Sequence, residues 1–287
     1  MSVAGGLHLA FERIRRVGGE SLQIFTRNQR QWHAAPISSE ERNAFRKARD
    51  SWGNWPLAVH NSYLINLASH NEDVRVKSVG AMTAEVERVV SLDIPYLIMH
   101  PGSHGGDGVD AGLERFVKNL DTAIESAKNA EGVMILIENT AGQGTSLGAT
   151  LSQLGYILNT SACGDRLGIC IDTCHLFASG YDFRTLDEYD KTLQQLEKEV
   201  GIQRIRFFHL NDSKRELGSK IDRHEHIGRG QIGKDGFRNL LNDSRFSMHP
   251  MTLETPKGED LLEDMENLAV LRSLITTNNR PESKIIG

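Results

Sequence analysis

The chain has 287 residues and a formal net charge of −5, and hydrophobic residues make up 39% of it. This composition excludes wholesale disorder, the charge gives no global bias toward nucleic acid, and no run approaches the ~18 apolar residues of a membrane span. The length suits one α/β barrel of about 250 residues, so we expect a single domain over residues 1–287. The first six residues lack a basic segment ahead of an apolar one, so we expect no signal peptide and a cytoplasmic location.

Seven short apolar runs follow one another along the chain and are separated by segments with helical periodicity. Several runs are almost continuous in Val, Ile, Leu and Phe, which is typical of parallel strands buried on both faces. Strands that alternate with helices predict a parallel sheet with right-handed crossovers, and we therefore expect a TIM (β/α)8 barrel. The runs are Leu22–Phe25, Leu57–His60, Tyr96–His100, Val133–Glu138, Leu167–Asp172, Ile205–Leu210 and Met251–Glu254.

Helix signals are clear in three of the segments between the runs. Asp110–Lys128 has apolar residues at 113, 116, 117, 120 and 124, which lie on one face of a helix. Leu186–Val200 repeats this pattern, and Gly201 follows it as the expected helix stop. Ser38, three residues ahead of Glu41, predicts a capping box at the start of another helix.

Six consecutive runs end on or next to a histidine or an acidic residue, 34 to 45 residues apart, which is one strand–helix unit each time. In an α/β barrel the carboxyl ends of all strands open onto one face, where active sites are built. Three carboxylates on one mouth would repel one another unless cations lay between them, and imidazole and carboxylate are suitable ligands for zinc, manganese or iron. A single such residue is more often structural, but six in register favour a metal site. They are His60, His100, Glu138, Asp172, His209 and Glu254.

Two short motifs add three further ligands. In Asp172-Thr-Cys-His175, a turn after the strand can bring His175 back over the mouth, and Asp222 and His224 point to one side if their backbone is extended. One tetrahedral zinc takes about four ligands, so five histidines and four carboxylates suit two or three ions. Cys174 lies beside this site but, like Cys163 and Cys170, is expected to pack as a small hydrophobe.

Several longer blocks resemble the signature blocks of the endonuclease IV family of apurinic/apyrimidinic (AP) endonucleases. The likeness runs from about residue 2 to residue 254 and beyond, with the blocks in the same order. It implies a TIM barrel with three zinc ions that hydrolyses the phosphodiester 5′ to an abasic site in duplex DNA, leaves a 3′-hydroxyl, and acts in base excision repair. The blocks are His100-Pro-Gly-Ser103, Ile137-Glu-Asn-Thr-Ala-Gly-Gln-Gly144, Cys170-Ile-Asp-Thr-Cys-His175, His209-Leu-Asn-Asp212 and Asp222-Arg-His-x-x-Ile-Gly-x-Gly-x-Ile-Gly233.

The resemblance also implies how the nine ligands would be shared among the ions. His60, His100 and Glu138 would hold the first zinc. Glu138, Asp172, His209 and Glu254 would hold the second. Manganese is possible at one of the three sites. His175, Asp222 and His224 would hold the third. Glu138 and Glu254 are the residues expected to serve catalysis, since paired metals can polarise a phosphate and generate hydroxide near neutral pH.

Contacts to DNA would come from loops on the same face of the barrel. Arg27 and Arg30 follow the first run, where basic side chains can neutralise phosphates. By the resemblance, Arg30, Tyr63 and Leu64 would penetrate the duplex and hold the abasic nucleotide flipped out. The partner would be double-stranded DNA with abasic sites and no membrane, the protein would be a monomer, and DNA would associate it with the nucleoid.

The family begins with a strand that ends Gly-Ala-His-x-Ser-x-Ala-Gly-Gly-Leu, whereas the match here begins at Ser2-Val-Ala-Gly-Gly-Leu7. We therefore expect the first strand of the barrel to be truncated or missing, either because the true start lies upstream or because the chain is naturally shortened. A barrel that lacks one strand has two unpaired edges beside its core.

Two other functions remain open. A sugar isomerase or epimerase on the same barrel would use Glu138, Asp172, His209 and Glu254 around a single metal, and would leave the other five ligand residues without a role. A protein that binds damaged DNA without cutting it would be expected to have lost a ligand, and none is lost in this sequence.

Overall fold

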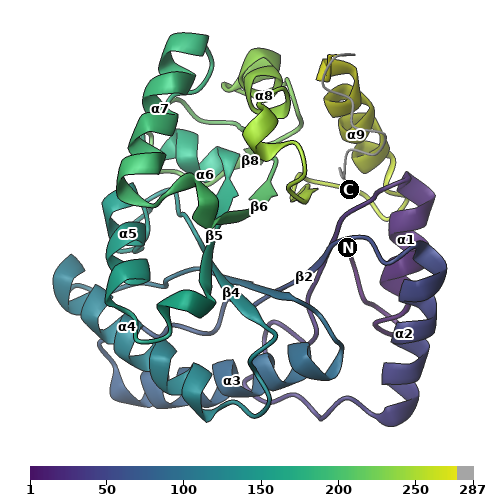
Figure 1. The fold of residues 1–287 in the computed structure, drawn as a ribbon, viewed down its shortest axis with the longest axis vertical. Coiled ribbons are helices and arrows are strands. Elements are labelled where there is room, and N and C mark those ends of the chain that lie inside the picture. The colour runs from purple at the N-terminus through teal and green to yellow at the C-terminus, as the bar shows by residue number, and fades with distance from the viewer. Residues whose placement is uncertain (277–287) are drawn as a thin grey trace.

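The computed structural model describes residues 1–276, and in it seven parallel strands follow one another around a barrel with helices on the outside (Figure 1). The order of the strands in the sheet is their order in the chain. All seven apolar runs form strands, which confirms the prediction of a TIM barrel. The strands are β1 (Leu22–Ile24), β2 (Leu57–His60), β3 (Tyr96–Met99), β4 (Met134–Glu138), β5 (Leu167–Asp172), β6 (Ile205–His209) and β9 (Met251–Thr252).

Helices connect the strands along the outer surface, and the predicted ones are confirmed. The segment 110–128 forms α4, the segment 186–200 forms α7, and the Ser38 hydroxyl accepts a hydrogen bond from the Glu41 amide at 3.1 Å to cap α2. The helices are α1 (Leu9–Val17), α2 (Ser39–Trp52), α3 (Glu72–Ser91), α4 (Val109–Ser126), α5 (Leu151–Thr160), α6 (Thr173–Ala178), α7 (Leu186–Glu199), α8 (Gly233–Leu241) and α9 (Leu262–Leu274). Among residues 1–276, no helix is both long and apolar enough to cross a membrane.

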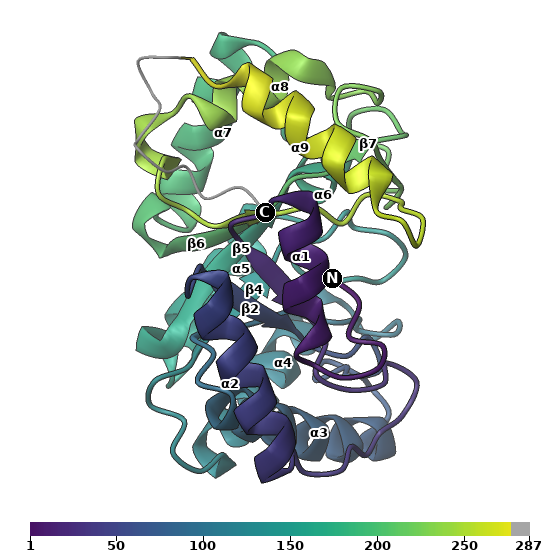
Figure 2. The ribbon, with the colours of Figure 1, turned by 90° about the vertical axis from the view of Figure 1, so that its right-hand side faces the viewer.

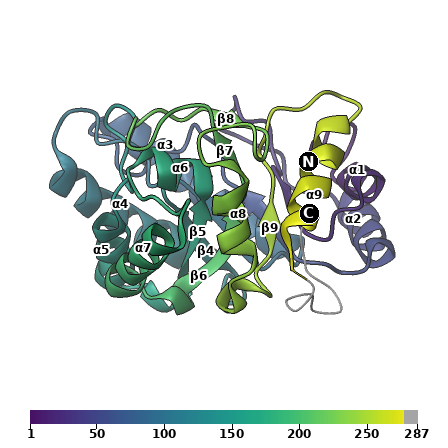
Figure 3. The same ribbon diagram turned by 90° about the horizontal axis from the view of Figure 1, so that it is seen from above.

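A second, two-stranded sheet lies above the barrel. The strands β7 (Asp212–Ser213) and β8 (His224–Glu225) pair antiparallel, and the hairpin lies beside α6 (Figure 3). This hairpin brings the segment that carries Asp222 and His224 back toward the mouth, although it follows β6 by more than a dozen residues.

The barrel interior is filled by one cluster of fully buried side chains from five consecutive strands: Ala58, Ile98, Leu136, Cys170 and Phe207. Each lies two residues before a histidine or carboxylate of the predicted site. Since side chains alternate along a strand, residues two apart share a face. The apolar cluster is therefore the floor on which the site is built, and Cys170 packs as the small hydrophobe that was predicted.

The barrel has an open seam between its first and last strands. Among the described residues β1 pairs with β2 and β9 pairs with β6, and neither has a second neighbour. A cavity of about 370 Å³ lies in the seam, below α1 and α9, which meet on that side of the molecule (Figure 2). The amino group of Met1 donates to the Gln23 carbonyl there at 2.7 Å. The expectation that the first strand is missing is thus confirmed as two free strand edges.

Candidate metal centre

All nine predicted ligand residues lie together at the carboxyl ends of the strands. They form three groups, and within each group the candidate ligand atoms lie within 4.8 Å of one another. The groups are His60–His100–Glu138, Glu138–Asp172–His209–Glu254 and His175–Asp222–His224. These are the same three sets that the family resemblance implied, with Glu138 shared by two of them. Cys174, which the sequence placed beside the site, has its sulfur within 4.8 Å of candidate ligand atoms of Asp172 and His224.

Local structure explains how His175, Asp222 and His224, which lie beyond the strand ends, reach the mouth of the barrel. Asp172 ends β5 and caps α6, because its carboxylate accepts a hydrogen bond from the His175 amide at 2.8 Å. The helix therefore turns at once, and His175 comes back over the barrel as predicted. His224 lies on β8, two residues after Asp222. One carboxylate oxygen of Asp222 lies 3.2 Å from His175 Nε2, and the other lies 3.2 Å from His224 Nε2.

Glu138 is the centre of the site. It is fully buried, and one carboxylate oxygen lies 3.0 Å from His60 Nε2 and 3.6 Å from His100 Nε2. The other lies 3.0 Å from His209 Nδ1 and 3.3 Å from His175 Nδ1. Burial alone would raise the pKa of Glu138, but the surrounding imidazoles hold it well below its ordinary value. The side chain is thus an anion held between four histidines.

Three of the histidines are oriented by backbone carbonyls. The Nδ1 atoms of His60, His175 and His224 lie 2.8, 3.0 and 3.1 Å from the carbonyl oxygens of Asn61, Asn139 and Glu254. A carbonyl only accepts hydrogen bonds, so each Nδ1 carries the proton and each Nε2 is free to bind a cation. This is the outer-shell pattern of histidines that hold metals.

The remaining ring nitrogens face acidic oxygens rather than neutral partners. His224 Nε2 lies 3.2 Å from Asp222 and 3.7 Å from Asp172, and within the described chain it is buried without a hydrogen bond. A neutral imidazole and an ionised carboxylate would oppose lone pair to lone pair, and a proton or a metal ion between them removes that conflict. The donor set therefore fits a divalent cation in each group.

Two asparagines that the sequence analysis missed hold Asp172 and Glu254 in place. Asn211 donates to the Asp172 carboxylate at 2.6 Å and accepts from the Glu254 amide at 2.8 Å. Asn139 accepts from the Asp172 amide at 2.7 Å. Both residues lie in the blocks that carried the resemblance, one or two positions after a predicted ligand, and that position was the available signal.

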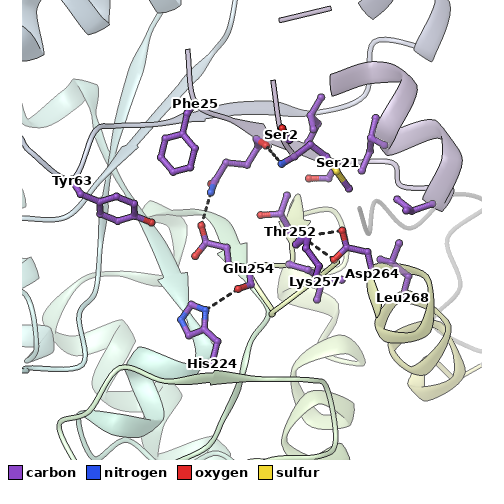
Figure 4. Close-up of a pocket in the computed structure, with 16 residues that line it drawn as sticks. Ser2, Ser21, Phe25, Tyr63, His224, Thr252, Glu254, Lys257, Asp264 and Leu268 are labelled. Atoms are coloured by element: carbon purple, nitrogen blue, oxygen red, sulfur yellow. Dashed lines mark hydrogen bonds and ion pairs between the residues drawn. The ribbon is translucent and has the colours of Figure 1, made fainter. Parts of the chain in front are cut away.

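The three predicted DNA-contacting residues lie on loops around the mouth. Tyr63 is 64% exposed, and its ring lies 5.4 Å from that of His60, between centroids. Arg30 is exposed and Leu64 is half-buried. Tyr63, Glu254 and His224 line the same cavity at the seam, and Figure 4 shows the Tyr63 ring directed toward Glu254.

The proposed phosphate contact of Arg27 is wrong. The Arg27 side chain is 2% exposed, lies 3.8 Å from the Glu85 carboxylate, and donates to the carbonyl oxygens of Gln31 and Trp32 at 2.6 and 2.5 Å. Its guanidinium therefore donates hydrogen bonds within the loop that carries Arg30, and it does not face solvent.

Comparison with known proteins agrees with this geometry. The chain matches the model of a family described as xylose isomerase-like TIM barrel over residues 11–274. A protein named probable endonuclease 4 from Chloroflexus aggregans is 50% identical over 279 residues, which cover 96% of each chain. One of the same name from Geobacter sulfurreducens is 45% identical over 285 residues, 98% of this chain and 96% of the relative. The crystal structure of endonuclease IV from Thermus thermophilus is similar with a TM-score of 0.85 and 34% sequence identity, covering 96% of both chains.

The fold and the family model define the class of the protein as a xylose isomerase-like TIM barrel. Within this class, the full-length likeness to the curated relatives and to the solved structure is decisive. The chain belongs to the endonuclease IV family of AP endonucleases, as its sequence blocks predicted.

The protonation states of His100 in the first group and of His224 in the third give a prediction that needs no DNA. Burial lowers the pKa of His100 to about 4, whereas the carboxylates of Asp172 and Asp222, against the effect of burial, raise the pKa of His224 to about 9. At about pH 7.5 the metal-free protein therefore holds a proton on His224, and zinc must displace it. We expect titration calorimetry in buffers of different ionisation enthalpy to show proton release that declines as the pH rises through about 9.

His224→Ala is expected to reduce this release, whereas His100→Ala removes an imidazole that is already neutral and should not reduce the number of protons released per zinc bound. A binding enthalpy that is the same in all buffers would contradict the protonation state.

Proposed function

We propose that the protein is a zinc-dependent AP endonuclease that binds three zinc ions. It hydrolyses the phosphodiester 5′ to an abasic site in double-stranded DNA, leaves a 3′-hydroxyl, and acts in base excision repair. The observation that carries this proposal is the gathering of nine imidazole and carboxylate ligands into three adjoining groups on one mouth. The relatives named endonuclease 4 support the same assignment.

The ligand residues would divide among the ions as the three groups indicate, with Glu138 between the first and second. When bound, zinc supplies a Lewis acid for the phosphate, a nucleophile near neutral pH and a stabilising charge for the leaving 3′-oxygen. Glu138 contacts His60 of the first group through one carboxylate oxygen and His209 of the second group through the other, so it would serve as a ligand in both groups. Glu254 has a 20% exposed side chain, so it lies at the open side of the site where the phosphate would enter.

The surroundings of the mouth suit an abasic nucleotide outside the helical stack. A cavity of about 410 Å³ opens between the loops after β2, β3 and β4, and its lining includes His60, Tyr63, His100 and Asp222. Three divalent cations against four carboxylate ligands would leave the mouth at about +2, so a phosphate would be attracted there although the chain as a whole is acidic. Arg30, Tyr63 and Leu64 would enter the duplex around this cavity.

The isomerase alternative is less well supported. The chain resembles a D-tagatose 3-epimerase-like protein with a TM-score of 0.72 and 21% identity, which indicates a shared fold only. A single-metal enzyme would need the group Glu138–Asp172–His209–Glu254 and no more. The other five ligand residues converge on the same mouth, and their chemistry is accounted for only by further ions.

We further propose a monomer that acts on DNA in the cytoplasm, at the nucleoid.

The decisive experiment is a nicking assay on one duplex with a single synthetic abasic site. We expect a single cut 5′ to that site with a 3′-hydroxyl end, no cut in the undamaged duplex, loss of cutting after chelation and recovery with zinc. Elemental analysis should give about three zinc ions per chain. One manganese ion per chain and no cutting would favour the isomerase instead.

Glu254 gives a test of the catalytic assignment. Glu254→Gln keeps the size of the side chain and its contact with solvent but removes the charge that the metal group requires. We expect cleavage to fall below detection while binding of abasic DNA, measured by fluorescence anisotropy, survives. Glu259→Gln, an exposed carboxylate five residues further along the chain, is the control and should cut normally. Unchanged turnover in Glu254→Gln would refute the assignment.

Arg30 and Tyr63 test the recognition of the lesion. Because both are expected to enter the duplex at the abasic site, Arg30→Ala and Tyr63→Ala should weaken binding to abasic DNA more than binding to undamaged DNA, by about 1–3 kcal/mol for each stacking interaction that is removed. Tyr156→Ala changes a partly exposed tyrosine on α5 and serves as the control. An equal weakening on both DNAs would mean that these side chains contribute only charge or packing.

A further inference from the structure

Gln23 joins two predicted ligands of the second group, and the sequence pattern did not mark it. It lies in β1 at the seam and is 8% exposed. Its amide nitrogen Nε2 donates to Glu254 Oε1 at 2.7 Å, and its oxygen Oε1 lies 2.6 Å from His209 Nε2. One side chain thus connects β1, β6 and the segment after β9, which are far apart in the sequence.

The chemistry of these two contacts determines which nitrogen of His209 carries the proton. An ionised carboxylate only accepts hydrogen bonds, so Gln23 must present its NH₂ group to Glu254. Its carbonyl oxygen then faces His209 and can only accept. His209 Nε2 therefore carries a proton. Nδ1, which faces carboxylates, is then the nitrogen that gives up its proton and presents a lone pair when a metal ion binds.

That lone pair points to the place where a cation would be held. His209 Nδ1 lies 3.0 Å from Glu138 Oε1, 3.3 Å from Glu254 Oε2 and 3.9 Å from Asp172 Oδ2. The same amide that accepts a hydrogen bond from Nε2 on the far side of the ring also donates one to Glu254 Oε1, which leaves Glu254 Oε2 for the common centre. Gln23 thus directs one nitrogen and one oxygen to the same point.

We propose that Gln23 is a positioning residue of the second metal group: it fixes His209 in the tautomer that binds a metal through Nδ1, and it orients Glu254 toward the same ion. This inference rests on the proposed metal centre and adds to it the residue that sets the binding atom. In the other oriented histidines, His60, His175 and His224, a backbone carbonyl has this role, and the free atom is Nε2.

The seam explains how Gln23 is held. The backbone amide of Leu22 faces β2 and donates to the Pro56 carbonyl at 3.0 Å. Backbone groups alternate in direction along a strand, so the Gln23 backbone faces the gap, and its carbonyl accepts from the Met1 amino group. The side chain that orients two ligands therefore belongs to a free strand edge, and Figure 4 shows that edge beside Glu254 and Thr252.

The first test measures zinc affinity on chelator-treated protein by competition with a chromophoric chelator. Gln23→Met keeps approximately the size of the side chain and removes both hydrogen bonds. Loss of an outer-shell partner commonly weakens metal binding about 10- to 100-fold, and we expect a loss of that size for one of the bound ions. Ser21→Ala is the matched control: Ser21 is fully buried just before β1 and lines the same cavity at the seam, and in residues 1–276 its hydroxyl has no partner.

Two results of this titration would overturn the proposal. One is wild-type zinc affinity in Gln23→Met. The other is an equal loss in Gln23→Met and Ser21→Ala, which would mean that any disturbance of the seam weakens the metal and that the amide has no specific part.

The second test needs no variant and remains decisive if Gln23→Met does not fold. Wild-type protein labelled with ¹⁵N and loaded with ¹¹³Cd should show metal coupling to His209 Nδ1 and to the Nε2 of His60, His175 and His224. Coupling to His209 Nε2 would overturn the proposal. Both tests read the metal without DNA, so a protein that passes them and fails to nick abasic DNA would refute the proposed function and leave this inference intact.

Discussion

The contact between one buried carboxylate and four imidazoles at the mouth of the barrel is the interaction on which the rest of the site depends. Glu138 has no exposed surface, yet histidines from β2, the end of β3, α6 and β6 surround it. A buried anion is costly unless it is paired, and it determines where the positive charge of the site must lie. The remaining carboxylates, Asp172, Asp222 and Glu254, extend the negative charge outward, and a proton on His224 balances part of it in the metal-free protein.

A hydrogen bond across the open seam joins the first strand to a ligand residue of the second metal group. Glu254 follows the last strand, Gln23 lies on the first, and the hydrogen bond between them at 2.7 Å crosses the gap where a further strand would otherwise stand. In a closed barrel, backbone pairing would hold these two strands in place. Here side-chain contacts of the second metal group contribute to that task, so the stability of the barrel and the geometry of the site are expected to depend on each other.

The comparison with sugar epimerases illustrates how one barrel serves different chemistry. The chain shares its fold with a D-tagatose 3-epimerase-like protein, and that likeness concerns the barrel alone. The proposed nuclease would use five further ligand residues. Three of them, His175, Asp222 and His224, lie on α6 and in the β7–β8 hairpin. Function is thus decided by short additions at the strand ends, while the barrel holds them in register.

Much of this protein follows from local pattern. Apolar runs of strand length, their regular spacing and a ligand at each strand end predict a parallel sheet with its chemistry on one face, because parallel strands all end on the same side of the sheet. The tertiary structure alone decided the rest. Arg27 looks like a DNA contact in the sequence and is buried against Glu85, which lies on a distant helix; Gln23 looks like an ordinary strand residue and contacts His209 and Glu254. Such contacts join residues that are far apart in the sequence, and no periodic pattern indicates them. The direction of each hydrogen bond, which determines the ring nitrogen that is left to bind a metal, depends on which donors and acceptors the folded chain places next to each other.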